Sequence, residues 1–140
     1  NKRHLIRIIE NKGQNTSDTK LRRNTLVLGI KLSKTQLRKR VEERVEYMFR
    51  RGLRKEVDKL QRQYGWEHEA LSGIGYKESE PYYRGETSMS EVKRLIVKNT
   101  MNLAKRQNTW FKRNRNIIWI EDKEQAMAKI RAFLADKEYN

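Results

Sequence analysis

The segment LAKRQNTWFKR, residues 103–113, places four cations and two aromatic rings within eleven residues. When the segment is extended back to Glu91 and drawn as a helix, its cations fall within about 40° of one another and its apolar side chains on another face. The cationic face carries Arg94, Lys98, Lys105 and Lys112, and the apolar face carries Val92, Leu95, Ile96, Leu103 and Trp110. We predict a helix that packs its apolar face on a core and presents a ladder of positive charge to a polyanion.

The composition favours a nucleic acid as that polyanion. Lys and Arg number 33 against 18 Asp and Glu, which gives a net charge of +15, and this is more typical of nucleic-acid binding than of binding to an anionic membrane. Three Trp, six Tyr and three Phe argue against a disordered basic tail. The chain has no Cys for disulfides or thiolate sites, and no run of about 18 apolar residues. We expect a cytoplasmic monomer with no membrane partner.

Two short strands are predicted, at residues 25–32 and 117–120, because β-favouring apolar residues concentrate there. A helix end at residues 1–10 and a polar connector at 11–24 precede the first strand. Two strands so far apart need a larger sheet to join. We therefore interpret the chain as a fragment of an α/β protein.

Most of the remaining chain is predicted to be helical, and capping residues mark where the helices begin. The predicted helices run from Ser33 to near Gly52, over 53–64, over a short stretch with Pro81 near its first turn, from Ser88 through 113, and onward from Asp122.

No catalytic constellation is evident. The stretch GIKLSKT at 29–35 lacks the glycines that a phosphate-binding P-loop requires, since Leu28 and Ser33 occupy those positions. His4 and His68 have no companions at metal-ligand spacing, and no nucleophile–His–acid arrangement is present. We therefore predict no metal site and assign no catalytic residue in this chain.

Two further features admit two interpretations each. Gly73-x-Gly75 is either a phosphate-binding turn to which Lys77 adds charge, or a tight turn with Tyr76 packed in the core. Trp110 either stacks on an RNA base or anchors its helix to the core, and its place on the apolar face favours the core. Tyr76, Tyr82 and Tyr83 are the other candidates for base stacking.

Four segments together resemble one family, and they occur in the order in which that family carries them. The segments are NKRHLIRIIE at 1–10, RVxxRVxxMFxxGLxxEV at 40–57, GIGYKE at 73–78 and AKRQxTWF at 104–111. Over nearly its whole length the chain resembles the C-terminal half of tRNA dimethylallyltransferase, the tRNA isopentenyltransferase or IPP transferase family.

The resemblance implies an α/β fold: a P-loop-type nucleotide-binding core with a helical insertion that grips the tRNA anticodon stem-loop. Residues 1–24 then correspond to the end of the insertion and a connector. Residues 25–140 form the C-terminal part of the core, a mainly helical piece that contributes two short strands to a parallel sheet.

The resemblance also implies an activity and its partners. The family transfers a dimethylallyl group from dimethylallyl diphosphate to the exocyclic amino group of the adenosine beside the anticodon, and Mg²⁺ assists the loss of diphosphate. The P-loop, the general-base Asp and most of the Mg²⁺ ligands belong to the N-terminal half, so the chain alone is expected to be inactive.

Site residues are carried over from the matching motifs. Lys105, Arg106 and Gln107 are expected beside the diphosphate and the reaction channel. The residues expected to contact tRNA are Arg3, His4, Leu5, Ile6, Arg7, Ser72, Gly73, Ile74, Gly75, Tyr76 and Lys77.

Two positions depart from the family pattern, because His4 and Met101 stand where Arg is usual. On the helical projection Met101 leaves a gap in the cationic ladder between Lys98 and Lys105. Two alternatives to an active transferase are a basic helical RNA-binding module without chemistry and a decayed paralogue that binds RNA.

Overall fold

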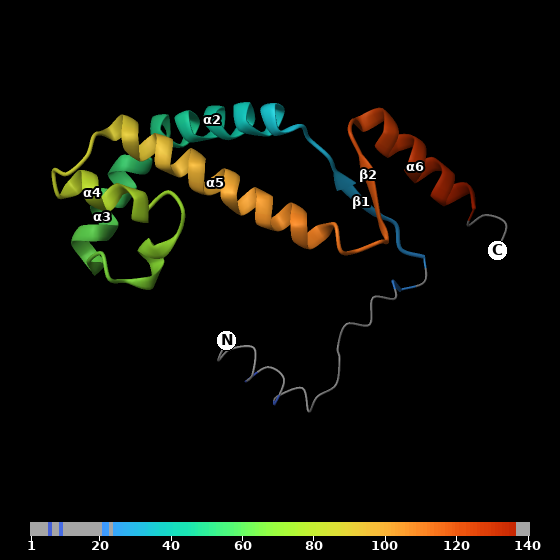
Figure 1. Cartoon of the computed structure of the whole chain (residues 1–140), viewed down its shortest axis with the longest axis horizontal. Helices are drawn as coiled ribbons and strands as arrows, with labels where there is room; N and C mark the ends of the chain where they lie inside the picture. The colour runs from blue at the N-terminus through green and yellow to red at the C-terminus, as the bar shows by residue number, and fades with distance from the viewer. Residues whose placement is uncertain (1–5, 7–8, 10–20, 23, 137–140) are drawn as a thin grey trace. The chain divides into compact units, whose positions relative to one another are not determined.

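The structure, a computed structural model, describes residues 6, 9, 21–22 and 24–136. It is mainly helical with a two-stranded parallel sheet, as the sequence predicted (Figure 1). Ile6 and Ile9 are helical, and the rest of the predicted helix at 1–10 lies outside the described residues. The elements in order are β1 (Val27–Ile30), α2 (Lys34–Arg50), α3 (Leu53–Tyr64), the 3₁₀ turns η1 (Glu69–Ser72) and η2 (Lys77–Ser79), α4 (Glu80–Tyr83), α5 (Met89–Phe111), β2 (Ile117–Ile120) and α6 (Lys123–Ala135).

The chain forms two compact units, residues 30–113 and residues 1–29 with 114–140. In the larger unit α2 and the first half of α5 lie side by side and antiparallel (Figure 1). Their apolar stripes meet in a core to which α3 adds two side chains, and each fully buried side chain contributes about 1.5–3 kcal/mol. The buried core residues are Val41, Val45, Leu53, Val57, Val92, Ile96 and Val97.

Capping residues and a glycine turn set the boundaries of α2, α3 and α4 near the predicted positions. Ser33 and Gln36 form a reciprocal capping box at the start of α2. Gly52 has a φ of +101°, which a residue with a side chain adopts only with strain, and it separates α2 from α3. Pro81 lies in the first turn of α4, as predicted.

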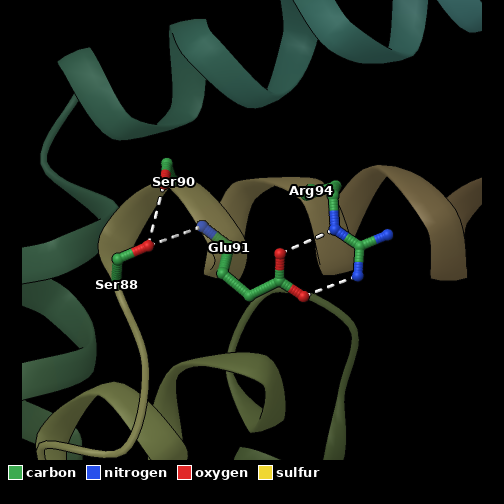
Figure 2. Close-up of polar contacts among 4 residues, drawn as sticks. All are labelled: Ser88, Ser90, Glu91 and Arg94. Carbon is green, nitrogen blue, oxygen red and sulfur yellow. Dashed lines mark hydrogen bonds and ion pairs between the residues drawn. The ribbon is translucent and has the colours of Figure 1, made fainter.

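The start of α5 differs from the expected capping box. Figure 2 shows the Ser88 hydroxyl accepting from the Glu91 amide at 3.3 Å, which is the expected cap. The Glu91 carboxylate turns toward Arg94 instead of the Ser88 backbone, with two hydrogen bonds of 2.7 and 2.5 Å from the guanidinium. A bidentate pair with a cation competes well against one neutral amide, so only half of the box forms.

In the smaller unit β2 pairs with β1, and α6 follows and contacts β2. Gly29 allows this pairing because a Cβ at its position would lie 2.6 Å from the Ile117 side chain and 2.9 Å from the Trp119 ring. Asp122 caps α6 by accepting from the Gln125 amide at 2.7 Å, as predicted.

Candidate nucleic-acid interface

The second half of α5 is almost fully exposed, and within residues 102–111 Ala104 alone is half-buried. Leu103 is 37% exposed and Trp110 is 65% exposed, although the apolar stripe predicted both to pack on a core. That prediction is wrong for these two residues, because the core partners of α5 end at Met101. Trp110 packs instead against its neighbour Phe111, with ring centroids 5.0 Å apart in an edge-to-face arrangement.

One side of this exposed segment forms a shallow pocket with a volume of about 480 Å³, here called the α5 face. Lys105 and Arg106, both predicted as site residues, lie on it, whereas the exposed Gln107 does not line it. The residues of the α5 face are Asn102, Lys105, Arg106, Thr109, Trp110 and Arg113.

The α5 face is positively charged and its cations are not neutralised. None of its residues is acidic, and among the described residues no carboxylate forms an ion pair with Lys105, Arg106 or Arg113. Three such cations around an exposed indole ring suit a phosphate-bearing ligand with a base that can stack.

The cations in the first half of α5 are engaged differently. Lys93 pairs with Glu46 of α2 at 2.7 Å, and Arg94 pairs with Glu91. The guanidinium that hydrogen-bonds Glu91 lowers the pKa of that carboxyl, and the pKa of Arg94 is raised in return. Lys98, also in the first half, is exposed and has no ion pair among the described residues.

Met101 places no cation between Lys98 and Lys105 on the ladder. Its side chain is partly buried and packs against the core. The position lies on the cationic side of the helix, and an unbranched, flexible side chain can turn from there toward the packed neighbours.

The stretch from Ser72 to Lys77 forms a tight turn. Gly75 has a φ of +106°, and the amides of Tyr76 and Lys77 both reach the Gly73 carbonyl at 3.2 Å. The Gly75 amide, one candidate donor for a phosphate, already donates to the Glu78 carboxylate at 2.8 Å. Of the two interpretations of this motif, the geometry favours the tight turn.

Tyr76 ties this turn to α3. Its hydroxyl donates to the Glu56 carboxylate at 2.9 Å, and its ring packs against the core. That hydrogen bond, followed by burial, raises the pKa of Tyr76 above its ordinary value. Tyr76 is thus a structural anchor, as the core interpretation predicted.

The other predicted aromatic candidates are engaged in packing. Tyr82 and Tyr83 contact each other edge to face, with centroids 5.5 Å apart, and both pack against the core. The Arg54 guanidinium lies 5.4 Å from the Tyr82 centroid, and the Tyr83 hydroxyl donates to the Arg54 carbonyl at 3.0 Å. Trp110 is therefore the most exposed of the four aromatic residues considered for base stacking.

Most of the tRNA contacts predicted near the start of the chain cannot be placed. Arg3, His4, Leu5 and Arg7 lie outside the described residues, and Ile6 is helical and 45% exposed.

Three residues of the α5 face were not predicted from the sequence. Asn102, Thr109 and Arg113 line the α5 face, and their three- and four-residue spacing from Lys105, Arg106 and Trp110 is a signal that identifies them. No sequence signal pairs Glu78 with Asn99, which meet across 21 residues of chain.

The described part of the chain contains no group of three or more His, Asp and Glu side chains that could hold a metal ion. The Mg²⁺ implied by the family resemblance therefore has no evident set of ligands there, and we derive no step through it. No helix in the described ranges combines the length and the apolar character needed to cross a membrane.

Comparison with known proteins gives a consistent result. The family model described as IPP transferase matches residues 2–114. A tRNA dimethylallyltransferase from Desulforamulus reducens is 42% identical over 98 residues, covering 70% of this chain and 35% of the relative. One from Acetivibrio thermocellus is 39% identical over 104 residues, covering 74% and 33%. The chain thus spans about a third of the length of the curated relatives it matches.

A solved structure agrees with the sequence matches. The crystal structure of the full-length tRNA isopentenylpyrophosphate transferase from Bacillus halodurans superimposes with a TM-score of 0.71 at 29% identity, covering 98% of this chain and 45% of that one. The family model spans well over half of the chain and, except for Asn1, all four segments that carried the resemblance. The chain belongs to the IPP transferase family.

Proposed function

We propose that the chain acts as the C-terminal portion of a tRNA-modifying transferase. This enzyme moves a dimethylallyl group from dimethylallyl diphosphate to the exocyclic amino group of the adenosine beside the anticodon. The names of the relatives support the reaction. The observation that carries the role of this chain is the α5 face, where Lys105, Arg106 and Arg113 are free of carboxylates among the described residues.

Lys105 and Arg106 are proposed to bind the diphosphate, with Gln107 beside them. As the bond between the prenyl carbon and its oxygen breaks, negative charge accumulates on the leaving diphosphate, and fixed cations stabilise it. The adenosine amine forms the new carbon–nitrogen bond and loses a proton to a base. The resemblance implies that this base, and the Mg²⁺ that would assist departure of the diphosphate, belong to the N-terminal half.

The tRNA anticodon stem-loop is proposed to contact the turn at 72–77 and the helix end at 3–7. The target adenosine must leave its stack to reach a donor, and the exposed ring of Trp110 offers a surface for a base next to the cations. We propose that the protein works as a monomer in the cytoplasm.

The test uses an assembled enzyme, in which this chain follows the N-terminal part of the Bacillus halodurans protein. We expect it to transfer a labelled dimethylallyl group to an anticodon stem-loop. A stem-loop with guanosine at the target position is the control, because it lacks the exocyclic amine at that ring carbon. The 140-residue chain alone is expected to bind the stem-loop without transfer.

Arg106→Ala in the assembled enzyme separates chemistry from binding. We expect turnover of bound stem-loop to fall more than affinity for it, because diphosphate charge develops in the transition state. If affinity collapses while turnover of bound stem-loop is unchanged, Arg106 only positions RNA phosphates. If the unsubstituted assembled enzyme binds RNA but does not transfer, the chain is a binding module or a decayed paralogue.

A further inference from the structure

The carboxyl group of Glu78 is buried between two segments of the proposed binding surface. Glu78 is only 5% exposed and lies in the turn η2, which begins at Lys77, the last residue of the Gly73–Lys77 turn. One oxygen accepts from the Gly75 amide at 2.8 Å, and the other accepts from the Asn99 side-chain amide of α5 at 2.6 Å. One side chain therefore connects the turn to the long helix.

This connection is costly to break. A buried carboxylate needs donors for its oxygens, since its water is lost on folding. Here the turn supplies one donor and α5 supplies the other, so neither segment can shift without leaving a buried oxygen unsatisfied. The Ser79 hydroxyl adds a long contact of 3.4 Å to the Gly75 carbonyl on the same turn.

The turn is fixed from a second side as well. The Tyr76 hydroxyl bonds Glu56 of α3, and the Gly75 Cα faces the Met48 side chain of α2, which lies 3.6 Å from where a Cβ would stand. The turn and the Glu78 that follows it therefore contact α2 and α3 as well as α5.

Asn99 lies on the side of α5 that carries the α5 face. Arg106 and Trp110 follow Asn99 by seven and eleven residues, which are close to whole numbers of helical turns, so the three side chains share one side. The rise per residue puts Arg106 about 10 Å along the axis from Asn99. The Glu78–Asn99 hydrogen bond thus holds the Gly73–Lys77 turn next to the end of the α5 face that lies nearest the core.

We propose that Glu78 is a positioning residue: by bridging the Gly75 amide and Asn99, it holds the Gly73–Lys77 turn in register with Lys105 and Arg106 on α5. The proposal rests on the proposed function, because it assumes that both segments bind the same stem-loop and donor. Glu78 itself is buried and acts only through the segments that it joins.

Asn99→Ala in the assembled enzyme tests this directly, because it removes the α5 link and leaves the Glu78–Gly75 bond. We expect the KM for the stem-loop to rise about tenfold, the scale of one lost hydrogen bond to a charged group.

Asn99→Asp is expected to raise the KM further, because it places two carboxylates against each other. In the double variant Glu78→Gln/Asn99→Asp, the new side-chain amide at 78 can donate to the new carboxylate at 99. Its amide oxygen can still accept from the Gly75 amide. We expect its KM to return to within about threefold of the unsubstituted enzyme.

Val41→Ala is the matched control for stability. Val41 is a buried core residue of α2, so this variant is expected to lower the melting temperature without changing the KM. A folded Asn99→Ala enzyme with an unchanged KM overturns the proposal. So does a double variant that does not fold, or that folds without recovering the KM relative to Asn99→Asp. If the unsubstituted assembled enzyme shows no transfer, the proposed function fails instead, and the same variants are then compared by stem-loop affinity.

Discussion

The two halves of α5 share one helix and one apolar stripe, yet they have opposite environments. From Met89 to Met101 the helix is capped, buried against α2, and its cations Lys93 and Arg94 are ion-paired. From Asn102 to Phe111 no residue is buried and the cations have no carboxylate partner among the described residues. The first half contributes to the core, and the second half leaves its cations and Trp110 exposed.

The comparison shows what helical periodicity can and cannot report. A stripe of apolar residues identifies the side of a helix that faces a neighbour, if there is one. It carries no information on how far the neighbour extends. Ile96 and Leu103 have equivalent positions on the stripe, but only Ile96, 2% exposed, has packed neighbours around it.

The largest expected effect comes from truncating these two residues in the 140-residue chain. Ile96→Ala should destabilise the fold by about 2–5 kcal/mol, because it leaves a cavity in a packed core. Leu103→Ala should cost less than about 0.5 kcal/mol, as for other exposed positions. Urea denaturation measures both. An equal loss for the two variants would mean that the second half of α5 is buried in solution.

Removing charge compares the two halves as binding surfaces. The triple variant Lys105→Ala/Arg106→Ala/Arg113→Ala of the assembled enzyme should lose about 10- to 100-fold in stem-loop affinity at about 50 mM salt. The matched control Lys93→Ala/Arg94→Ala/Lys98→Ala removes the same charge from the first half. We expect a smaller loss there, since Lys93 and Arg94 already have carboxylate partners. Equal losses, with equal changes in salt dependence, would show that only the total charge matters.

Helix boundaries were predictable because their causes are local. Ser33, Gly52 and Asp122 act on backbone groups within four residues, so the sequence pattern contains the whole interaction. Lys105 and Arg106 were predicted in a different way, from the family motif, and both lie on the α5 face.

The features that were not predictable depend on distant parts of the chain. Exposure of Trp110 depends on where the core ends, and the role of Met101 depends on which neighbour reaches it. Glu78 and Asn99 meet only because η2 docks on α5. Such contacts follow from tertiary packing, which periodicity and caps do not specify.

The cap at the start of α5 tests whether the first half depends on its local signals. Ser88→Ala should destabilise the 140-residue chain by about 1 kcal/mol, because the Glu91 amide loses its acceptor. Ser90→Ala is the control, because among the described residues that hydroxyl hydrogen-bonds with Ser88 alone. This variant should change stability by a few tenths of a kcal/mol. Thermal unfolding separates the two. If both variants are neutral, packing alone determines where the helix begins.

The smallest expected effect concerns the pair in Figure 2, which neutralises Arg94 in the first half of α5. Because Arg94 lowers the pKa of Glu91 in the folded state, the pair stabilises the fold above the unfolded value of 4.5, and the contribution is lost as the pH falls through the lowered folded value. Glu91→Gln should therefore flatten the acid side of the plot of melting temperature against pH by a small amount. The difference from the unsubstituted chain should vanish at about 1 M salt, where exposed charges are screened. A difference that persists at high salt would mean that Glu91 acts through its hydrogen bonds and not through its charge. The two halves of α5 would then differ mainly in the hydrogen-bond geometry of their side chains, and less in how far their charges are neutralised.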